Sequence, residues 1–382
     1  MLLNRFKSLL VLAFSLFCIL FSANVSANDT THHTTHEAGV HAAGTGEEKK
    51  KGSFNAQEVI FDHVLNGHEF HFMDLVGENG EKHPVSIPLP IIIYSAERGG
   101  LTAFMSSKFE HGHAAYKGYR LEHGKIIAVK EDGITKDEAV KLVDLSISRN
   151  VVQMFLAVIV LLWIMLGIAK RYKQGVGVKS APKGLQNAIE PVVIFVRDEV
   201  AKPNLGHNAG KYLPYLLTIF FFILINNIFG LIPGSANVTG NIAFTAVLGV
   251  ISLIVILFSS NKHYWAHIFN PPVPGAMKPV IALVELLGAV FTKPASLIIR
   301  LFANMLAGHI IIICLISLIF IFAGMSKAIG WGFSPISVAF TVFIYFIEIL
   351  VAFIQAFIFT NLTAVFIGQA REGEHHAEGA HH

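Results

Sequence analysis

The chain has 382 residues, of which 53% are hydrophobic and 14% are charged, and its mean hydropathy is +0.57. A chain this apolar is not an ordinary soluble protein, and several membrane spans are expected. The net charge of +3 is too small to indicate nucleic-acid binding, and Cys18 and Cys314 lie in separate apolar runs, so no disulfide is expected.

Residues 1–27 have the pattern of a cleavable signal peptide. Two basic residues precede an apolar run, Leu9–Phe21, and Val25–Ala27 supply small residues before the cleavage point. The alternative is a retained first span, for which this apolar run is short. The next residues, 28–53, are polar and rich in histidine, so we expect a disordered linker there.

Residues 54–145 have the composition of a globular domain and contain no apolar run of span length. Alternation and β-branched residues predict strands at Glu69–Met73, Ile91–Tyr94 and Lys125–Lys130. The stretch Lys136–Leu145 predicts an amphipathic helix that leads into the membrane. We therefore expect a small extracytoplasmic α+β domain.

Histidines are frequent in this domain, and they leave a metal site open as an alternative. His68 and His71 are three residues apart, and His111 and His113 are two apart, but the chain has no zinc-protease HExxH motif. Solvated surface histidines are the simpler interpretation. We therefore predict no metal and no other cofactor.

Residues 146–370 predict an all-α multi-pass membrane domain with five transmembrane passages. The first passage, Val151–Ala169, is followed by a cluster of lysine and arginine, which places this end in the cytoplasm. The segment Leu185–Val200 predicts an amphipathic helix that lies on the cytoplasmic interface. The other passages are expected at Leu213–Ile232, Asn241–Phe258, Val280–Phe322 with a break at Lys293 and Pro294, and Ile336–Ala370.

The last two passages predict two long antiparallel helices. A short turn that contains Gly324, Gly330 and Pro335 is expected between them. After five passages the polar tail, residues 371–382, lies in the cytoplasm.

Arg300 stands within the apolar part of the fourth passage. It lies about 10 Å along a helix from Lys293 and is flanked by leucine, isoleucine and phenylalanine, which places it inside the hydrocarbon. A charge at that depth costs on the order of 3 kcal/mol. It therefore indicates a functional site, with a structural salt bridge as the alternative.

Three runs of sequence carry a family resemblance. They are the run from Lys293 to Gly308 around Arg300, the run from Gln355 to Phe359, and the run NIFGLIP from Asn227 to Pro233. These runs occur in the same order in subunit a of the rotary F-type ATP synthase, which the chain resembles over residues 184–370.

The resemblance implies a proton-conducting stator subunit of the bacterial inner membrane that is no enzyme by itself. Two aqueous half-channels would lead to a rotating c-ring, and Arg300 would face the carboxylates of the ring and separate the half-channels. The implied partners are the c-ring, the subunit b stalk and the lipid bilayer, without nucleic acid. No nucleotide is expected to bind directly, because no Walker-type loop is present.

Helix spacing predicts how the last two helices meet. Arg300 and His309 lie about 13.5 Å apart along one helix, and Glu348 and Gln355 lie about 10.5 Å apart along the other. Laid antiparallel, Gln355 comes level with Arg300, and Glu348 comes level with His309. Asn304 shares the helix face of Arg300, which we expect to face the rotor.

A histidine beside a carboxylate can exchange protons near neutral pH, so His309 and Glu348 are candidates for the outer half-channel. A buried structural His–Glu contact is the alternative, and many family members carry the two residue types exchanged. The resemblance adds Asn227 to the outer path and Glu285 to the inner one, with solvation at the cytoplasmic interface as the alternative for Glu285. Ser296 is a further candidate for the inner path, with close helix packing as its alternative. The spacing from Glu285 to the lysine that begins the arginine helix is one residue longer than the resemblance implies.

Two other functions are alternatives at this point. An ion-coupled secondary transporter would show inverted repeats and a substrate cavity at the midplane, and neither is evident. A membrane-anchored extracytoplasmic metal-binding protein is indicated by the histidines alone, and five passages exceed what an anchor needs. The histidine at position 309 favours protons over sodium as the transported ion.

Overall fold

The computed structural model describes residues 69–76, 82–112, 114–122, 125–130, 135–137, 140–175, 184–232, 235–270 and 277–371. The predicted signal peptide, linker and C-terminal tail lie outside these residues. The described chain divides into two compact units. The first contains its residues up to 154 together with 229–238 and 306–348, and the second contains 155–228, 239–305 and 349–371.

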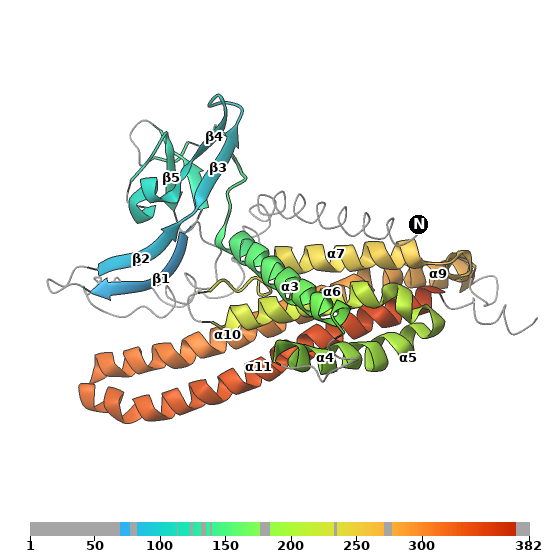
Figure 1. Ribbon diagram of the computed structural model, residues 1–382. Helices are drawn as coiled ribbons and strands as arrows, with labels where there is room; N and C mark the ends of the chain where they lie inside the picture. Colours follow the sequence, from blue (N-terminus) through green and yellow to red (C-terminus); the bar gives the residue numbers. More distant parts are fainter. Residues whose placement is uncertain are drawn as a thin grey trace, which may run out of the picture. The chain divides into compact units, whose positions relative to one another are not determined.

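The N-terminal part of the first unit consists of short antiparallel sheets (Figure 1). β3 (Pro90–Ser95) is the central strand of a three-stranded sheet, between β4 (Gly100–Met105) and β7 (Val143–Asp144). The remaining strands form two hairpins, β1 (Glu69–Val76) with β2 (Lys82–Pro88), and β5 (Tyr119–Glu122) with β6 (Lys125–Ala128). The three strands predicted from the sequence are confirmed as β1, β3 and β6.

The predicted helix at Lys136–Leu145 is wrong. Its last part is strand β7, which pairs with β3 and places Leu142 against the domain core while Val143 is exposed. This alternation has a period of two residues, so the hydrogen bonds offered by β3 override the helical pattern in the local sequence.

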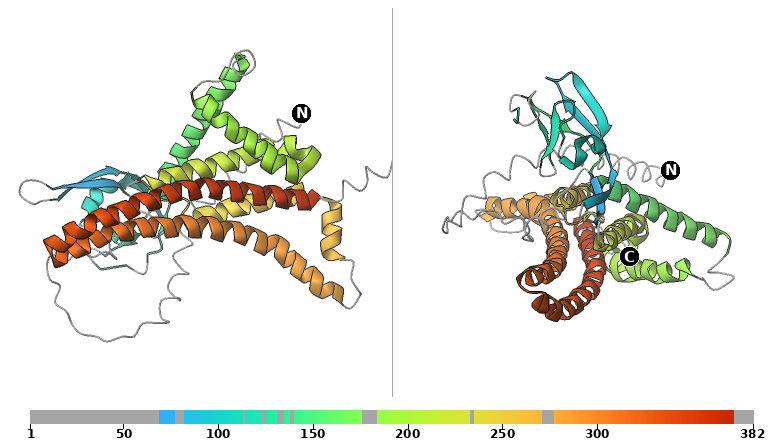
Figure 2. Two further views of the ribbon diagram at one scale, coloured as in Figure 1. Left: turned by 90° about the horizontal axis from the view of Figure 1, so that it is seen from below. Right: turned by 90° about the vertical axis from the view of Figure 1, so that its left-hand side faces the viewer.

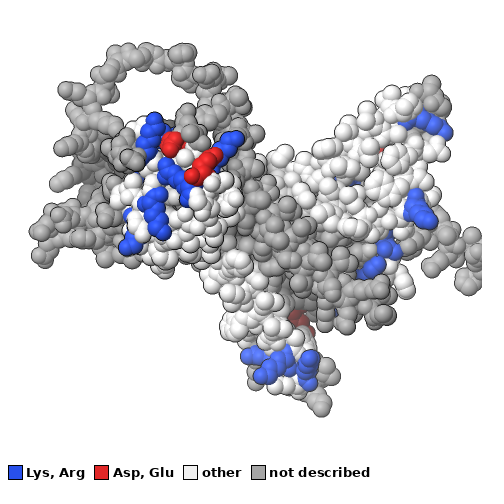
Figure 3. Space-filling model, turned by 90° about the horizontal axis from the view of Figure 1, so that it is seen from above, with Lys and Arg blue, Asp and Glu red and all other residues white. Residues whose placement is uncertain are grey.

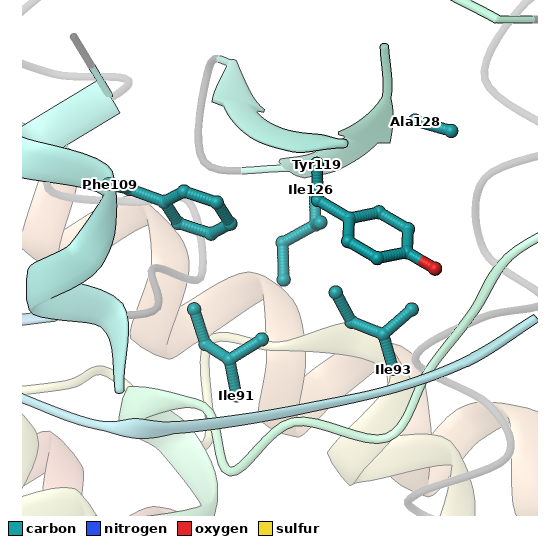
Figure 4. Close-up of a cluster of buried hydrophobic side chains, with 6 residues drawn as sticks. All are labelled: Ile91, Ile93, Phe109, Tyr119, Ile126 and Ala128. Carbon is teal, nitrogen blue, oxygen red and sulfur yellow. The ribbon is translucent and has the colours of Figure 1, made fainter. Parts of the chain in front are cut away.

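The core of this domain lies between the inner face of the β4–β3–β7 sheet and the layer formed by β5, β6 and the 3₁₀-helix η1 (Ser106–Gly112). Figure 4 shows the six buried side chains that form it: Ile91, Ile93, Phe109, Tyr119, Ile126 and Ala128. Every one of them is apolar except for the Tyr119 hydroxyl, so burial of apolar surface stabilises the domain.

Arg98 joins the β3–β4 turn to the opposite layer. Its guanidinium donates hydrogen bonds to the carbonyl oxygens of Gly118 at 2.5 Å and Val129 at 2.8 Å, and lies 3.3 Å from the Asp137 carboxylate. The same group lies over the Tyr119 ring, 5.3 Å from its centroid. One side chain thus connects three separate segments of the chain.

Five helical stretches of the described chain are long and apolar enough to cross a membrane, so the predicted five passages are confirmed. The first is α3 (Arg149–Lys173), and the third is α7 (Ile242–Ser259), whose Asn241 cap accepts the Ala243 N–H at 2.9 Å. The second contains α4 (Leu185–Phe195), the π-helix η2 (Val196–Ala201), α5 (Lys202–Leu205), η3 (Gly206–Asn208) and α6 (Ala209–Leu231). A short helix, α8 (Lys262–Phe269), follows α7.

The fourth stretch, which carries Arg300, is continuous and has no break at Lys293. It contains α9 (Lys278–Leu287), a π-helical segment η5 (Gly288–Thr292) and α10 (Lys293–Met325). In η5 the Lys293 N–H bonds the Gly288 carbonyl, five residues earlier. This wider turn comes just before Pro294 and reduces the clash of the proline ring with the preceding turn, so the helix continues.

The final helix, α11 (Lys327–Arg371), starts earlier than predicted, because only Ser326 separates it from α10. Figure 2 shows the hairpin that the two helices form. In the first unit the rings of Phe322 and Phe333 pack edge to face, with their centroids 4.6 Å apart. A Cβ at Gly330 would lie 2.7 Å from the Ala323 Cα. Gly330 therefore lies inside the helix and permits close packing, where a turn was expected.

Candidate functional site

Arg300 lies on the exposed face of α10 in the second unit. On the neighbouring face of the helix Leu297 is 2% exposed and Leu301 is fully buried, whereas Arg300, Ala303 and Asn304 are exposed. Helical periodicity explains this division, since the buried pair is four residues apart. The arginine charge therefore points away from the helices that bury the other face of α10.

Asn304 and Gln355 meet across α10 and α11 in the second unit. The Asn304 amide donates to Gln355 Oε1 at 2.9 Å, and the Gln355 side chain is 1% exposed. Helix spacing placed Gln355 level with Arg300, whereas the structure pairs it with the residue one turn further along α10. The predicted shared face of Arg300 and Asn304 agrees with their common exposure.

Glu348 reaches α10 beside His309 in the first unit. The Glu348 side chain is 7% exposed, and its carboxylate lies so close to Gly308 that a Cβ there would be 1.6 Å from Oε1. Gly308 directly precedes His309, which is partly buried. Within the described chain the other carboxylate oxygen, Oε2, has no hydrogen-bond partner. A buried carboxylate oxygen of this kind needs a proton or a polar partner from outside the protein chain.

Asn227 connects α6 to the same part of α11. It is fully buried, and its amide donates to the Ala352 carbonyl at 3.1 Å. Ala352 lies between Glu348 and Gln355 in the sequence of α11. The Asn227 Oδ1 has no partner among the described residues, so this buried amide retains one free acceptor.

The π-helical segment accounts for the long spacing of Glu285. This residue is in α9, and η5 lies between it and α10. A π-bulge inserts one extra residue into an α-helix. The π-helical segment therefore accommodates the extra residue. Glu285 faces the same direction as it would in a regular α-helix that is one residue shorter. Ser296 is partly buried in the first turns of α10.

Tyr264, which lies near Glu285, was missed from the sequence, and so were the contacts of Lys293. The pKa of Tyr264 in α8 is raised, first by burial and then by the negative charge of Glu285. Lys293 Nζ donates to Gln369 Oε1 at 3.0 Å and lies 5.7 Å from the Tyr264 ring centroid and 5.1 Å from that of Phe366. The aromatic run of α8 was the available signal, because a lysine near several aromatic rings often forms cation–π contacts.

No group of three potential metal ligands occurs among the described residues. Two of the four spaced histidines that raised this alternative, His68 and His113, lie outside the described residues.

Comparison with known proteins identifies the helical part. The family model described as "ATP synthase A chain" matches residues 151–368. The chain belongs to this family. The resemblance inferred from three short runs is thereby confirmed, and the chain is a proton-translocating subunit of the membrane sector. A second family model, described as a domain of unknown function, matches residues 59–146.

Several similar proteins are subunits a of ATP synthases. ATP synthase subunit a of Chloroherpeton thalassium is 46% identical over 242 residues, which cover 62% of this chain and 70% of the relative. The corresponding protein of Chlorobium phaeobacteroides strain BS1 is 46% identical over 245 residues, with the same coverage. That of Myxococcus xanthus is 38% identical over 268 residues, covering 68% and 82%.

Proposed function

We propose that Arg300 separates two half-channels in this membrane-sector subunit and faces the carboxylates of a rotating c-ring. The observation that carries the proposal is the exposure of Arg300 on a helix that buries Leu297 and Leu301 on the neighbouring face. In the described chain Arg300 makes no salt bridge. A charge inside an apolar span requires a partner, and a carboxylate on a neighbouring subunit provides one.

The outer half-channel uses His309 and Glu348, because a histidine beside a carboxylate supplies both a proton donor and a proton acceptor. A partnerless carboxylate oxygen at Glu348 supports its role as a proton acceptor. Asn227 and Gln355 are amides and do not titrate. They position α11 and hold water through their remaining hydrogen-bonding groups, and Asn304 orients Gln355.

The inner half-channel uses Glu285, with Ser296 along its path. Burial, and after it the negative charge of Glu285, raises the pKa of Tyr264, which supports a position of Glu285 close to that phenol. In this assignment the arginine prevents direct proton flow between the two paths, so each proton must travel on the rotor. The protein conducts ions and leaves nucleotide chemistry to other subunits.

The proposed partners are the c-ring, at the exposed face of α10, and the subunit b stalk. The proposed location is the bacterial inner membrane, with residues 54–145 outside the cytoplasm and the C-terminus inside it. The basic cluster Lys170–Lys173 at the end of α3 supports this orientation.

The central proposal predicts the effect of Arg300→Ala. ATP-driven acidification of inverted vesicles should be abolished while the assembled complex is still recovered, because the residue is exposed and holds no described contact. Arg300→Lys should restore little, since an ammonium lacks the planar fork of donors. Arg197→Ala is the matched control, because Arg197 is also exposed and, among the described residues, bonds the neighbouring Asp198 alone. Normal pumping by the Arg300→Ala protein would refute the proposal.

A further inference from the structure

The outer face of the β4–β3–β7 sheet is apolar throughout. Register and hydrogen bonds align its residues in three rows of three across the strands. The residues of this outer sheet face are Leu101, Tyr94 and Val143 in the first row, Ala103, Ile92 and Leu145 in the second, and Met105, Pro90 and Ile147 in the third. An antiparallel sheet with one face in water shows polar side chains on that face, so this sheet is built to be covered on both sides.

Several exposed residues of the outer sheet face are large. Leu101 is 65% exposed, Tyr94 46%, Met105 43% and Val143 40%. With strands about 4.8 Å apart and same-face residues about 6.7 Å apart, the face measures on the order of 300 Å². A stable dimer needs about 800 Å² from each partner, so a second copy of this chain is a poor occupant.

The outer sheet face continues directly into the first membrane span. The Ile147 N–H still bonds the Pro90 carbonyl at 3.2 Å, and α3 begins at Arg149, so only Ser148 lies between the sheet and the helix. One residue spans less than about 4 Å. The third row of the face therefore lies close to the start of α3.

Polar groups occur at the opposite end of the face and on the other side of the domain. Beyond the first row, the exposed Glu97 carboxylate accepts the Lys141 backbone N–H at 2.6 Å. The layer that covers the inner face of the sheet carries exposed lysines at positions 117, 125 and 130, and Figure 3 shows lysine and arginine gathered on this domain. One side of the domain is thus apolar and the other is charged.

We infer that the outer sheet face rests on the lipid leaflet at the Arg149 end of α3. The aliphatic side chains enter the boundary between headgroups and acyl chains, and Tyr94 lies where aromatic residues are enriched in membrane proteins. The layer with the exposed lysines faces the aqueous phase. The domain then acts as a monotopic membrane anchor that fixes the position of the start of α3 in the membrane.

Fluorescence quenching in the assembled complex tests this inference. In a Cys314→Ser background, Leu101→Cys and Val143→Cys each place an environment-sensitive fluorophore on the outer sheet face, and Lys125→Cys places it on the charged layer. In nanodiscs whose phospholipids carry bromine near the headgroup, both face positions should be quenched several-fold more than the Lys125 position. Aqueous iodide should show the opposite order.

Equal iodide quenching at all three positions would show that the face is in water and would overturn the inference. A photoreactive group at Leu101 that cross-links another protein, without quenching by brominated lipid, would also overturn it and identify a protein surface as the occupant. Agreement between Leu101 and Val143 separates lipid contact from a local distortion caused by one substitution.

Discussion

Glycine at position 308 allows a carboxylate to touch the helix that carries the arginine. A Cβ there would lie 1.6 Å from Glu348 Oε1 and 2.7 Å from Cδ, so any larger residue moves the carboxylate. Glycine inside a helix costs about 1 kcal/mol relative to alanine. The position of Glu348 therefore depends on a residue that weakens the helix locally.

Gly308→Ala should slow proton pumping about tenfold, which corresponds to about 1.4 kcal/mol on the barrier. The substitution displaces the Glu348 carboxylate and should leave the amount of assembled complex unchanged, since alanine favours the helix. ATP-driven acidification of inverted vesicles measures the effect. Gly167→Ala is the control, because no atom lies within 4 Å of a Cβ there. Unchanged pumping by Gly308→Ala would mean that the carboxylate position is unimportant.

Exchange of His309 and Glu348 tests whether the two groups act together. Glu348→Gln or His309→Ala alone should slow proton entry by roughly 10²-fold, the lower range for loss of a positioned proton-transfer group. The double variant His309→Glu with Glu348→His restores both groups in reversed order. It should pump faster than the product of the single losses allows, because only interacting groups are non-additive. Multiplicative losses in the same vesicle assay would show that the residues act separately.

Residue chemistry predicted much of the candidate site, and helix spacing predicted less. Arg300 and Glu348 were identifiable because ionisable groups are costly inside hydrocarbon. The pairing of Gln355 with Asn304 was not predictable, because axial spacing ignores side-chain reach and the lateral offset between packed helices. Tyr264 was missed because it lies distant in sequence from Glu285, and only the fold brings α8 close to α9.

Among the elements, η5 has the most direct effect on site geometry. It accommodates one additional residue between Glu285 and Arg300. In a regular α-helix of the same sequence, Glu285 would be rotated about the helix axis by roughly 100°, the step of one residue. Sequence periodicity alone could not show this, because a π-helical segment has no strong composition of its own. The one sign of η5 in the sequence was the spacing from Glu285 to Lys293, which is one residue longer than expected.

Deletion of Gly288 should convert η5 into regular α-helix and keep Glu285 near its present facing, so pumping should fall by less than about tenfold. Insertion of one alanine after Gly288 adds a second extra residue, which turns Glu285 away, and should reduce pumping far more. The two proteins are compared by acidification of inverted vesicles at matched complex levels. Equal losses would show that η5 does not compensate for the additional residue.

The length of α11 limits how it crosses the bilayer. Its 45 residues have a contour length of about 67 Å, against about 30 Å of hydrocarbon. Between its terminal residues Glu348 is the only charged side chain. A helix this long and apolar stays within hydrocarbon only if it is strongly inclined or curved. Composition predicted a long helix. Its start at Lys327, nine residues before the predicted start at Ile336, depends on the close packing that Gly330 permits.

At the scale of the whole molecule, a β domain that matches a family of unknown function precedes a membrane domain that matches a known family. Only Ser148 lies between Ile147, the last residue bonded to the sheet, and the first residue of α3. The membrane domain was predictable because long apolar runs and short motifs have few alternatives. The β domain was predicted less well, since its sheet pairs strands distant in sequence, such as β3 and β7.

The orientation of the molecule is tested by cysteine labelling at the two ends of α3. In a Cys314→Ser background, Lys130→Cys lies in the β domain and Gln174→Cys lies just after α3, and both positions are exposed. The basic cluster at Lys170–Lys173 favours a cytoplasmic location for the second position. An impermeant maleimide should therefore label Lys130→Cys in intact cells, from which any outer membrane has been removed, and label Gln174→Cys only after permeabilisation. Both proteins should react fully in detergent, which controls for thiol reactivity. Labelling in the reverse order would place the β domain in the cytoplasm and would exchange the assignments of the inner and outer half-channels.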